Sequence, residues 1–174
     1  MVGVLAIQGG YLEHEAMLTQ AGIPFKEVRS LADIEGVTAV ILPGGESTVM
    51  EQFMQAYGLK EWLLQRAQDP SFVIFGTCAG LILLARWGLL NVTVERNAYG
   101  RQLASFTAQL HVQDLGVIPG HFIRAPKITR VGEGVDVLSE HEGVPVLVRQ
   151  GDIWGASFHP ELAGNSSLHA RLFS

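Results

Sequence analysis

The stretch from Phe72 to Gly80 constrains the fold more than any other part of the chain. It begins with four apolar residues typical of a buried strand, continues as Gly76-Thr77-Cys78-Ala79-Gly80, and leads into an apolar run of helical character. This pattern predicts a strand that turns sharply into a helix, with glycines that let the backbone pass close on either side. The side chain of Cys78 is then expected to point out of the sheet beside the N-terminus of the helix, where the amide dipoles favour a thiolate. We expect a nucleophile here; an inert, buried core cysteine is the alternative.

Short strands, most of them apolar, alternate with helical segments through the first half of the chain. The expected strands span residues 2–7, 25–28 and 39–42, and the expected helices span residues 11–21, 48–57 and 59–68. This alternation is typical of a parallel sheet covered by helices on both faces. The second half carries mostly short β-type runs, at 92–94, 103–110, 117–123, 128–131, 144–148 and 153–158, before a last helix near 167–173. We therefore expect a three-layer, flavodoxin-like α/β fold with antiparallel strands added in the second half, and one domain over residues 1–174.

Composition excludes several classes of function. The net charge is −5 without any basic block, which argues against binding to a nucleic acid. No apolar run approaches the ~20 residues that cross a bilayer, and the first residues read as a buried strand without the basic region of a signal peptide. A lone cysteine forms no internal disulfide and suits a reducing cytoplasm. We expect a cytoplasmic protein with no cofactor and no metal.

A candidate base follows the last predicted strand, as His159-Pro160-Glu161. In extended backbone, residues two apart point to the same side, so Glu161 is expected beside the imidazole of His159. A carboxylate in that position fixes the tautomer of a histidine and stabilises the imidazolium. An ordinary proline turn with both side chains in solvent is the alternative. Because parallel strands end at one edge of a sheet, the base and Cys78 are expected to meet there.

A third component is the diglycine of Pro43-Gly44-Gly45, which also follows a predicted strand. Glycines can present backbone amides to an oxyanion where a side chain would block the approach. The amides of Gly45 and Ala79 are the candidate oxyanion-hole donors. Taken by itself, the same diglycine would be an ordinary turn.

These motifs together resemble the class I, or triad-type, glutamine amidotransferases. The segments that carry the likeness are residues 42–48 (LPGGEST), 75–80 (FGTCAG) and 157–162 (SFHPEL). Three further segments are similar to the glutaminase subunit of pyridoxal 5′-phosphate synthase: Gln8-Gly9 with Glu13-His14, residues 94–102 (VERNAYGRQ), and residues 122–126 (FIRAP). The likeness extends from Val2 to about Leu162.

The resemblance implies a role for each matching residue. Cys78 would attack the side-chain carboxamide of L-glutamine, with His159 as base and Glu161 as the group that orients it. The residues that would bind the substrate are Gly45, Glu46, Ser47, Arg96, Ile123 and Arg124. Without the family likeness, either arginine would be taken for a surface ion-pair residue.

The resemblance also implies a partner. In this family a ring-shaped synthase subunit receives the ammonia, makes pyridoxal 5′-phosphate, and switches on glutamine hydrolysis when the glutaminase docks. Two features depart from the family pattern: a short connection at Arg86-Trp87, and Thr107 where an acidic residue is common. The rival interpretations are a class I glutaminase that serves a different synthase and a flavodoxin-like binding protein with a redox-sensing cysteine.

Overall fold

A central sheet of seven strands organises the molecule, which we describe from a computed structural model over residues 1–96, 99 and 105–174. The strands lie in the order β2-β1-β3-β4-β11-β10-β9. Their bounds are β1 Val2–Leu5, β2 Phe25–Val28, β3 Ala39–Leu42, β4 Val73–Thr77, β9 Asp136–His141, β10 Val144–Gln150 and β11 Ile153–Ala156. The first five in this order are parallel, and β10 and β9 continue the sheet as antiparallel neighbours.

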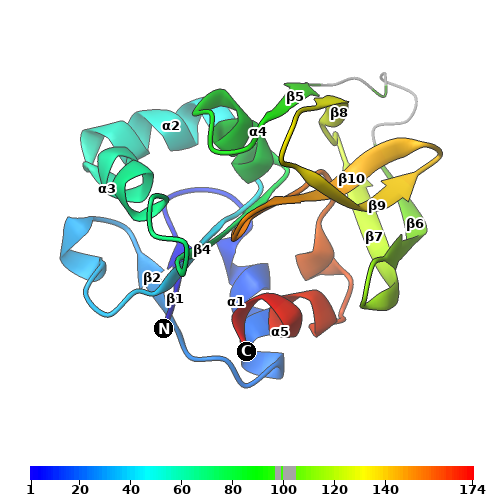
Figure 1. Ribbon diagram of the computed structural model, residues 1–174. Helices are drawn as coiled ribbons and strands as arrows, with labels where there is room; N and C mark the ends of the chain where they lie inside the picture. The colour runs from blue at the N-terminus through cyan, green and yellow to red at the C-terminus, as the bar shows by residue number, and fades with distance from the viewer. Residues whose placement is uncertain (97–98, 100–104) are drawn as a thin grey trace.

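Helices cover both faces of this sheet (Figure 1). The longer helices are α1 Tyr11–Gln20, α2 Ser47–Ala56, α3 Leu59–Arg66, α4 Ala79–Arg86 and α5 Ser167–Phe173. In Figure 1, α2, α3 and α4 lie on one side of the sheet, and α1 and α5 lie on the other. Every residue of β1 and β3 is buried, as expected for parallel strands that are covered on two faces.

Two small antiparallel sheets flank the far end of the central one. They are formed by β5 Val92–Glu95 with β8 Lys127–Val131, and by β6 Ser105–Val112 with β7 Gly116–Ile123. The β6–β7 hairpin reaches the carboxyl edge of the central sheet, where the backbone amide of His159 donates to the carbonyl of His121 at 2.8 Å. The hairpin therefore helps to fix the backbone of the predicted base.

The expected α/β class is confirmed, with local differences. Strand β9 was not predicted, because Asp-Val-Leu-Ser-Glu-His carries few apolar residues and lies at the edge of the sheet. Two single-turn 3-10 helices, η1 Leu31–Asp33 and η3 Pro160–Leu162, were also not predicted. The first two residues of the strand expected at 103–110 lie outside the described residues.

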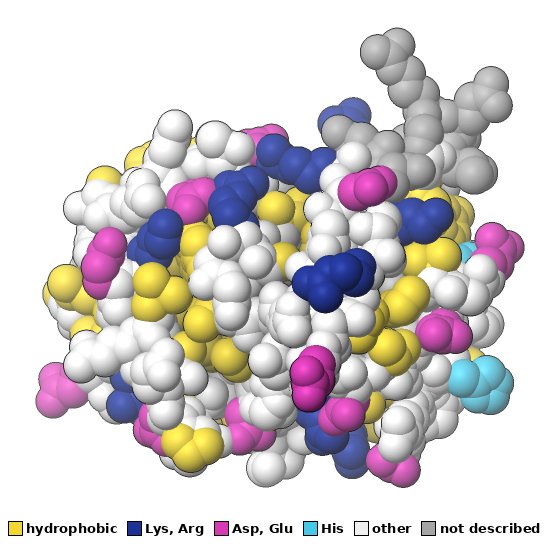
Figure 2. All heavy atoms as spheres, turned by 45° about the horizontal axis from the view of Figure 1, so that its top comes forward, with side chains coloured by type: hydrophobic (Ala, Val, Ile, Leu, Met, Phe, Trp, Pro, Cys, Tyr) yellow, Lys and Arg dark blue, Asp and Glu magenta, His cyan; other side chains and the backbone are white. Residues whose placement is uncertain are grey.

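Among the described residues, no helix combines the length and the apolar character needed to cross a membrane. Basic and acidic side chains are interspersed over the face shown in Figure 2.

Candidate active site

Cys78 stands at the turn between β4 and α4, as the sequence predicts. Its backbone has φ 49° and ψ −101°, a conformation that L-residues with a side chain seldom adopt and that stores strain. The two flanking glycines are required by packing. A Cβ at Gly76 would lie 2.7 Å from the backbone carbon of Gly80, and a Cβ at Gly80 would collide with the backbone carbonyl of Leu42. The turn therefore holds Cys78 against the first turn of α4.

A histidine and a glutamate lie beyond the end of β11, the strand next to β4. Nδ1 of His159 and Oε1 of Glu161 are 2.6 Å apart, and the carboxylate is buried. The expectation of extended backbone between them was wrong. Pro160 begins the 3-10 turn η3, and its fixed φ suits the first position of such a turn. The turn, and not the alternation of a strand, brings the carboxylate to the ring.

The electrostatics of this pair favour a charged imidazole. Burial alone would lower the pKa of His159, but hydrogen bonds to Cys78 and Glu161 outweigh it and raise the pKa to about 10. Burial alone would raise the pKa of Glu161, but the imidazoles of His14 and His159 lower it overall. An imidazolium held between a thiol and a carboxylate is the arrangement that activates a sulfur nucleophile.

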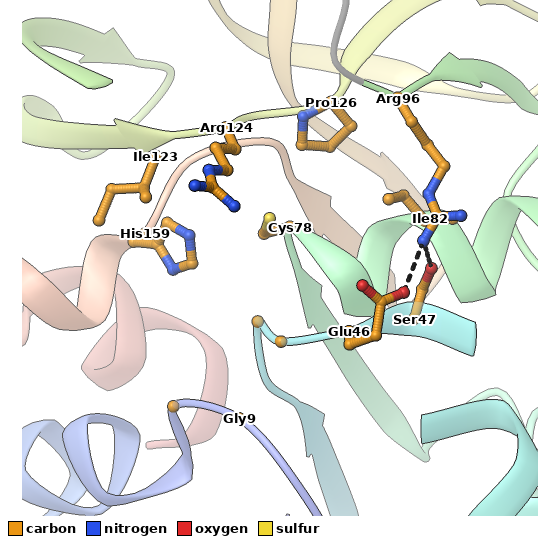
Figure 3. Close-up of a pocket in the computed structure, with 13 residues that line it drawn as sticks. Gly9, Glu46, Ser47, Cys78, Ile82, Arg96, Ile123, Arg124, Pro126 and His159 are labelled. Carbon is orange, nitrogen blue, oxygen red and sulfur yellow. Dashed lines mark hydrogen bonds and ion pairs between the residues drawn. The ribbon is translucent and has the colours of Figure 1, made fainter. Parts of the chain in front are cut away.

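A pocket of about 600 Å³ opens beside Cys78 and His159 (Figure 3). All six residues predicted to bind substrate line it: Gly45, Glu46, Ser47, Arg96, Ile123 and Arg124. In Figure 3, Ile123 and Arg124 lie on the side of His159, and Arg96 lies opposite, above Glu46 and Ser47. Glu161 is not a lining residue, because it lies behind the imidazole. Ala79 also does not line the pocket, and its side chain is buried.

Arg96 contacts the loop that follows β3, Pro43 to Ser47. Its guanidinium donates to Oε1 of Glu46 at 3.0 Å and to the hydroxyl of Ser47. Arg96 lies just after β5, so this contact ties that strand to the start of α2. The planar guanidinium thereby binds a carboxylate and a hydroxyl of this loop at the same time.

Several residues of the pocket were missed by the sequence analysis. Gly9 and Gly10 follow β1 and line the pocket beside Gly44. Their diglycine at a strand end is the same signal as Gly44-Gly45 and could have identified them. Ile82 and Pro126 complete the lining. Pro126 belongs to the family-like segment 122–126, whereas nothing in the sequence distinguishes Ile82 from an ordinary core residue.

The most consequential residue outside the pocket lining is His14, which the family likeness includes without giving it a role. It is fully buried, and its Nε2 lies 3.5 Å from Oε2 of Glu161. Residues 97–98 and 100–102, which belong to the segment 94–102 of the family likeness, lie outside the described residues.

The fold and the site define a class: α/β proteins in which a cysteine at a strand-to-helix turn faces a histidine–carboxylate pair across the edge of the sheet. The chain belongs to the SNO glutamine amidotransferase family, whose model matches residues 4–173.

Curated relatives cover nearly the whole chain. It is 48% identical to a pyridoxal 5′-phosphate synthase subunit PdxT of Thermus thermophilus, over 97% of this chain and 94% of that protein. It is 41% identical to the PdxT subunit of Methanocaldococcus jannaschii, over 94% of this chain and 90% of that protein. A crystal structure of a glutamine amidotransferase superposes with a TM-score of 0.95 at 46% identity, covering 98% of this chain and 96% of the other. The structure of PurLQS from Thermotoga maritima, with a TM-score of 0.70 at 17% identity and coverage of 98% and 96%, shares the fold alone.

Proposed function

We propose that this chain is the glutamine-hydrolysing subunit of a pyridoxal 5′-phosphate synthase. The observation that carries the proposal is the convergence of Cys78 and the His159–Glu161 pair on one pocket. The near full-length identity to PdxT subunits supports the choice of pathway. We take residues 1–174 as a single glutaminase domain. A cytoplasmic location fits a nucleophilic thiol, which must stay reduced.

The first half of the reaction forms a thioester. The thiolate of Cys78 adds to the side-chain carbonyl carbon of L-glutamine, and the carbonyl oxygen becomes an oxyanion. The backbone amides of Gly45 and Ala79 are the proposed donors to that oxyanion. The imidazolium of His159 then gives its proton to the nitrogen, the carbon–nitrogen bond breaks, and ammonia leaves a γ-glutamyl thioester on Cys78.

The second half returns the free thiol. Neutral His159 takes a proton from water as the water oxygen adds to the thioester carbonyl, and the carbon–sulfur bond breaks to release glutamate. Throughout, Glu161 keeps the Nδ1 proton of His159 in place so that Nε2 faces the sulfur. The lining residues Glu46, Ser47, Arg96, Ile123 and Arg124 would bind the rest of the substrate.

The ammonia requires a second active site close by, because in bulk water it would be protonated and lost. We propose that it passes to a synthase subunit with a ring-shaped core, and that docking on this core switches on hydrolysis. The isolated chain is then weakly active.

The test combines the chain with a candidate pyridoxal 5′-phosphate synthase subunit and measures glutamate release and pyridoxal phosphate formation. Cys78→Ala should abolish both while the complex still forms. His111→Asn is the matched control, because this histidine is exposed and does not line the pocket. Hydrolysis that survives in Cys78→Ala would overturn the assignment of the nucleophile. Turnover only with the synthase of another pathway would favour the rival glutaminase.

A further inference from the structure

A chain of buried polar side chains lies behind the proposed triad. His14 comes from α1, His169 from α5 and Thr77 from the end of β4, and all three are fully buried. Nδ1 of His14 is 2.9 Å from Nε2 of His169, and Nε2 of His14 is 3.2 Å from the hydroxyl of Thr77. The same Nε2 lies 3.5 Å from Oε2 of Glu161. His14 therefore contacts the carboxylate of Glu161 and is itself held by residues from α5 and β4.

The buried carboxylate of Glu161 requires a polar group beside it. Its Oε1 pairs with His159, but no described residue makes a hydrogen bond to its Oε2, which is also cut off from solvent. An ionised carboxylate oxygen without a facing proton is costly at such a site. His14 is the group placed to supply that proton, because its Nε2 is an ion-pair distance from Oε2.

The positions of the protons follow from the same contacts. If Nε2 of His14 carried a lone pair, that lone pair would face the carboxylate at 3.5 Å and repel it. The favourable tautomer has the proton on Nε2, which leaves Nδ1 of His14 as the acceptor. Nε2 of His169 must then donate to Nδ1. This assignment leaves the unpartnered Nδ1 of His169 as a bare acceptor instead of a buried donor.

We propose that His14 is a positioning residue for glutamine hydrolysis: its Nε2–H holds Glu161 in place behind His159, and His169 fixes the ring of His14. The inference rests on the proposed function, because it gives His159 the role of base. His14 does not line the pocket beside Cys78. It acts only through Glu161, and its contact with Thr77 ties that carboxylate to the residue that precedes Cys78.

The charged and titratable groups around the carboxylate are His159 from its own turn, His14 and Glu13 from α1, and His169 from α5. Burial lowers the pKa of His14 and lowers that of His169 to about 3, so both rings are neutral at working pH. A neutral donor stabilises the ionised form of Glu161 and lowers its pKa. Removal of that donor should let the carboxyl take up a proton at a higher pH.

Two amide variants separate the positioning role from a purely structural one. In His14→Asn, the side chain is too short to reach Glu161 but keeps a polar group near His169. In His14→Gln, the longer side chain can place an N–H where Nε2 lies. We expect His14→Asn to lower kcat about 10- to 100-fold, the range found when a group that orients a metal ligand from behind is removed. We expect the KM for glutamine to change less than about twofold, because the substrate is not contacted.

The acid limb of kcat/KM against pH is the readout that a structural role would not move. In His14→Asn it should rise by about one pH unit, a typical effect of losing one facing donor. His14→Gln should restore both kcat and the acid limb most of the way, and His111→Asn should leave both unchanged. A wild-type kcat and acid limb in His14→Asn would overturn the proposal. The proposal would also be overturned if His14→Asn and His14→Gln lowered kcat equally and neither shifted the acid limb.

A third variant, His169→Asn, covers the case in which His14→Asn does not fold. His169→Asn removes the donor to Nδ1 of His14 without touching Glu161, and it should move the acid limb in the same direction by a smaller amount; an unmoved limb overturns the proposal. The rate of Cys78 alkylation by iodoacetamide gives the same pH comparison on the isolated chain. If wild type shows no glutamine turnover with the synthase, the proposed function fails, while the alkylation profiles still decide the role of His14.

Discussion

The close approach of Gly44 to the proposed base gives the sharpest test of the site. A Cβ at Gly44 would lie 2.5 Å from Cε1 and 3.1 Å from Nδ1 of His159, and 3.5 Å from Cβ of Cys78. Ordinary van der Waals contact begins near 3.4 Å, so the imidazole or the loop must move by about an ångström. Misplacement of a catalytic group by about 1 Å can reduce the rate by about 100-fold. We therefore expect Gly44→Ala to lower kcat by about that factor, equivalent to about 2.7 kcal/mol in the activation free energy.

The assay is glutamate release by the complex with the synthase subunit, with the thermal midpoint of the chain measured alongside. Gly134→Ala is the control for a general loss of stability. Its φ of +82° strains any side chain, but nothing lies within 4 Å of the added Cβ, so it should cost about 1–2 kcal/mol of stability and leave kcat unchanged. If Gly44→Ala keeps more than half of the wild-type kcat, the packing of the loop against His159 does not control the reaction.

Three further predictions concern charged groups. Burial alone would raise the pKa of Glu51, but hydrogen bonds from Trp87, Arg86 and Lys60 lower it to about 2. Ionised Glu51 therefore stabilises the folded protein fully above about pH 4.5, and this stabilisation is lost as the pH falls toward 2. Urea unfolding should show Glu51→Gln about 2 kcal/mol less stable at pH 7 and a flatter acid profile; an unchanged midpoint would contradict this role. NMR of histidine-labelled protein should show His159 protonated up to about pH 10 and titrating at lower pH in Glu161→Gln, whereas titration near 6.5 in wild type would refute the charged pair. Arg96→Ala should raise the KM for glutamine about tenfold with a smaller effect on kcat. An unchanged KM would show that Arg96 does not contribute to glutamine binding.

The departures from the family pattern find partners in the structure. Arg86 and Trp87 both donate to the carboxylate of Glu51, so the short connection after α4 is anchored to α2. The hydroxyl of Thr107 lies 3.3 Å from Nδ1 of His121 on the neighbouring strand. None of Arg86, Trp87 and Thr107 lines the pocket. His121 also accepts the backbone hydrogen bond of His159, so Thr107 is linked to the proposed base through one residue.

Local sequence signals were sufficient for most of the fold. The strands at 25–28 and 39–42 and the last helix at 167–173 have the predicted bounds, and Pro24 and Pro43 mark the start of the first strand and the end of the second. Strand β9 was missed, since an edge strand gains its stability from pairing with β10 and needs little apolar sequence of its own. The 3-10 turn at Pro160 was missed for a similar reason: a single turn has no periodicity to read.

By itself, the sequence determined the α/β class, the cysteine turn and the histidine–glutamate motif, because each depends on neighbouring residues that have few allowed backbone conformations. Only the tertiary structure decided that His14 faces inward and reaches Glu161. Charged residues flank His14 on α1, so helical periodicity did not identify its buried side. The burial of His14 depends on the packing of α1 against α5 and η3, which come from the opposite end of the chain.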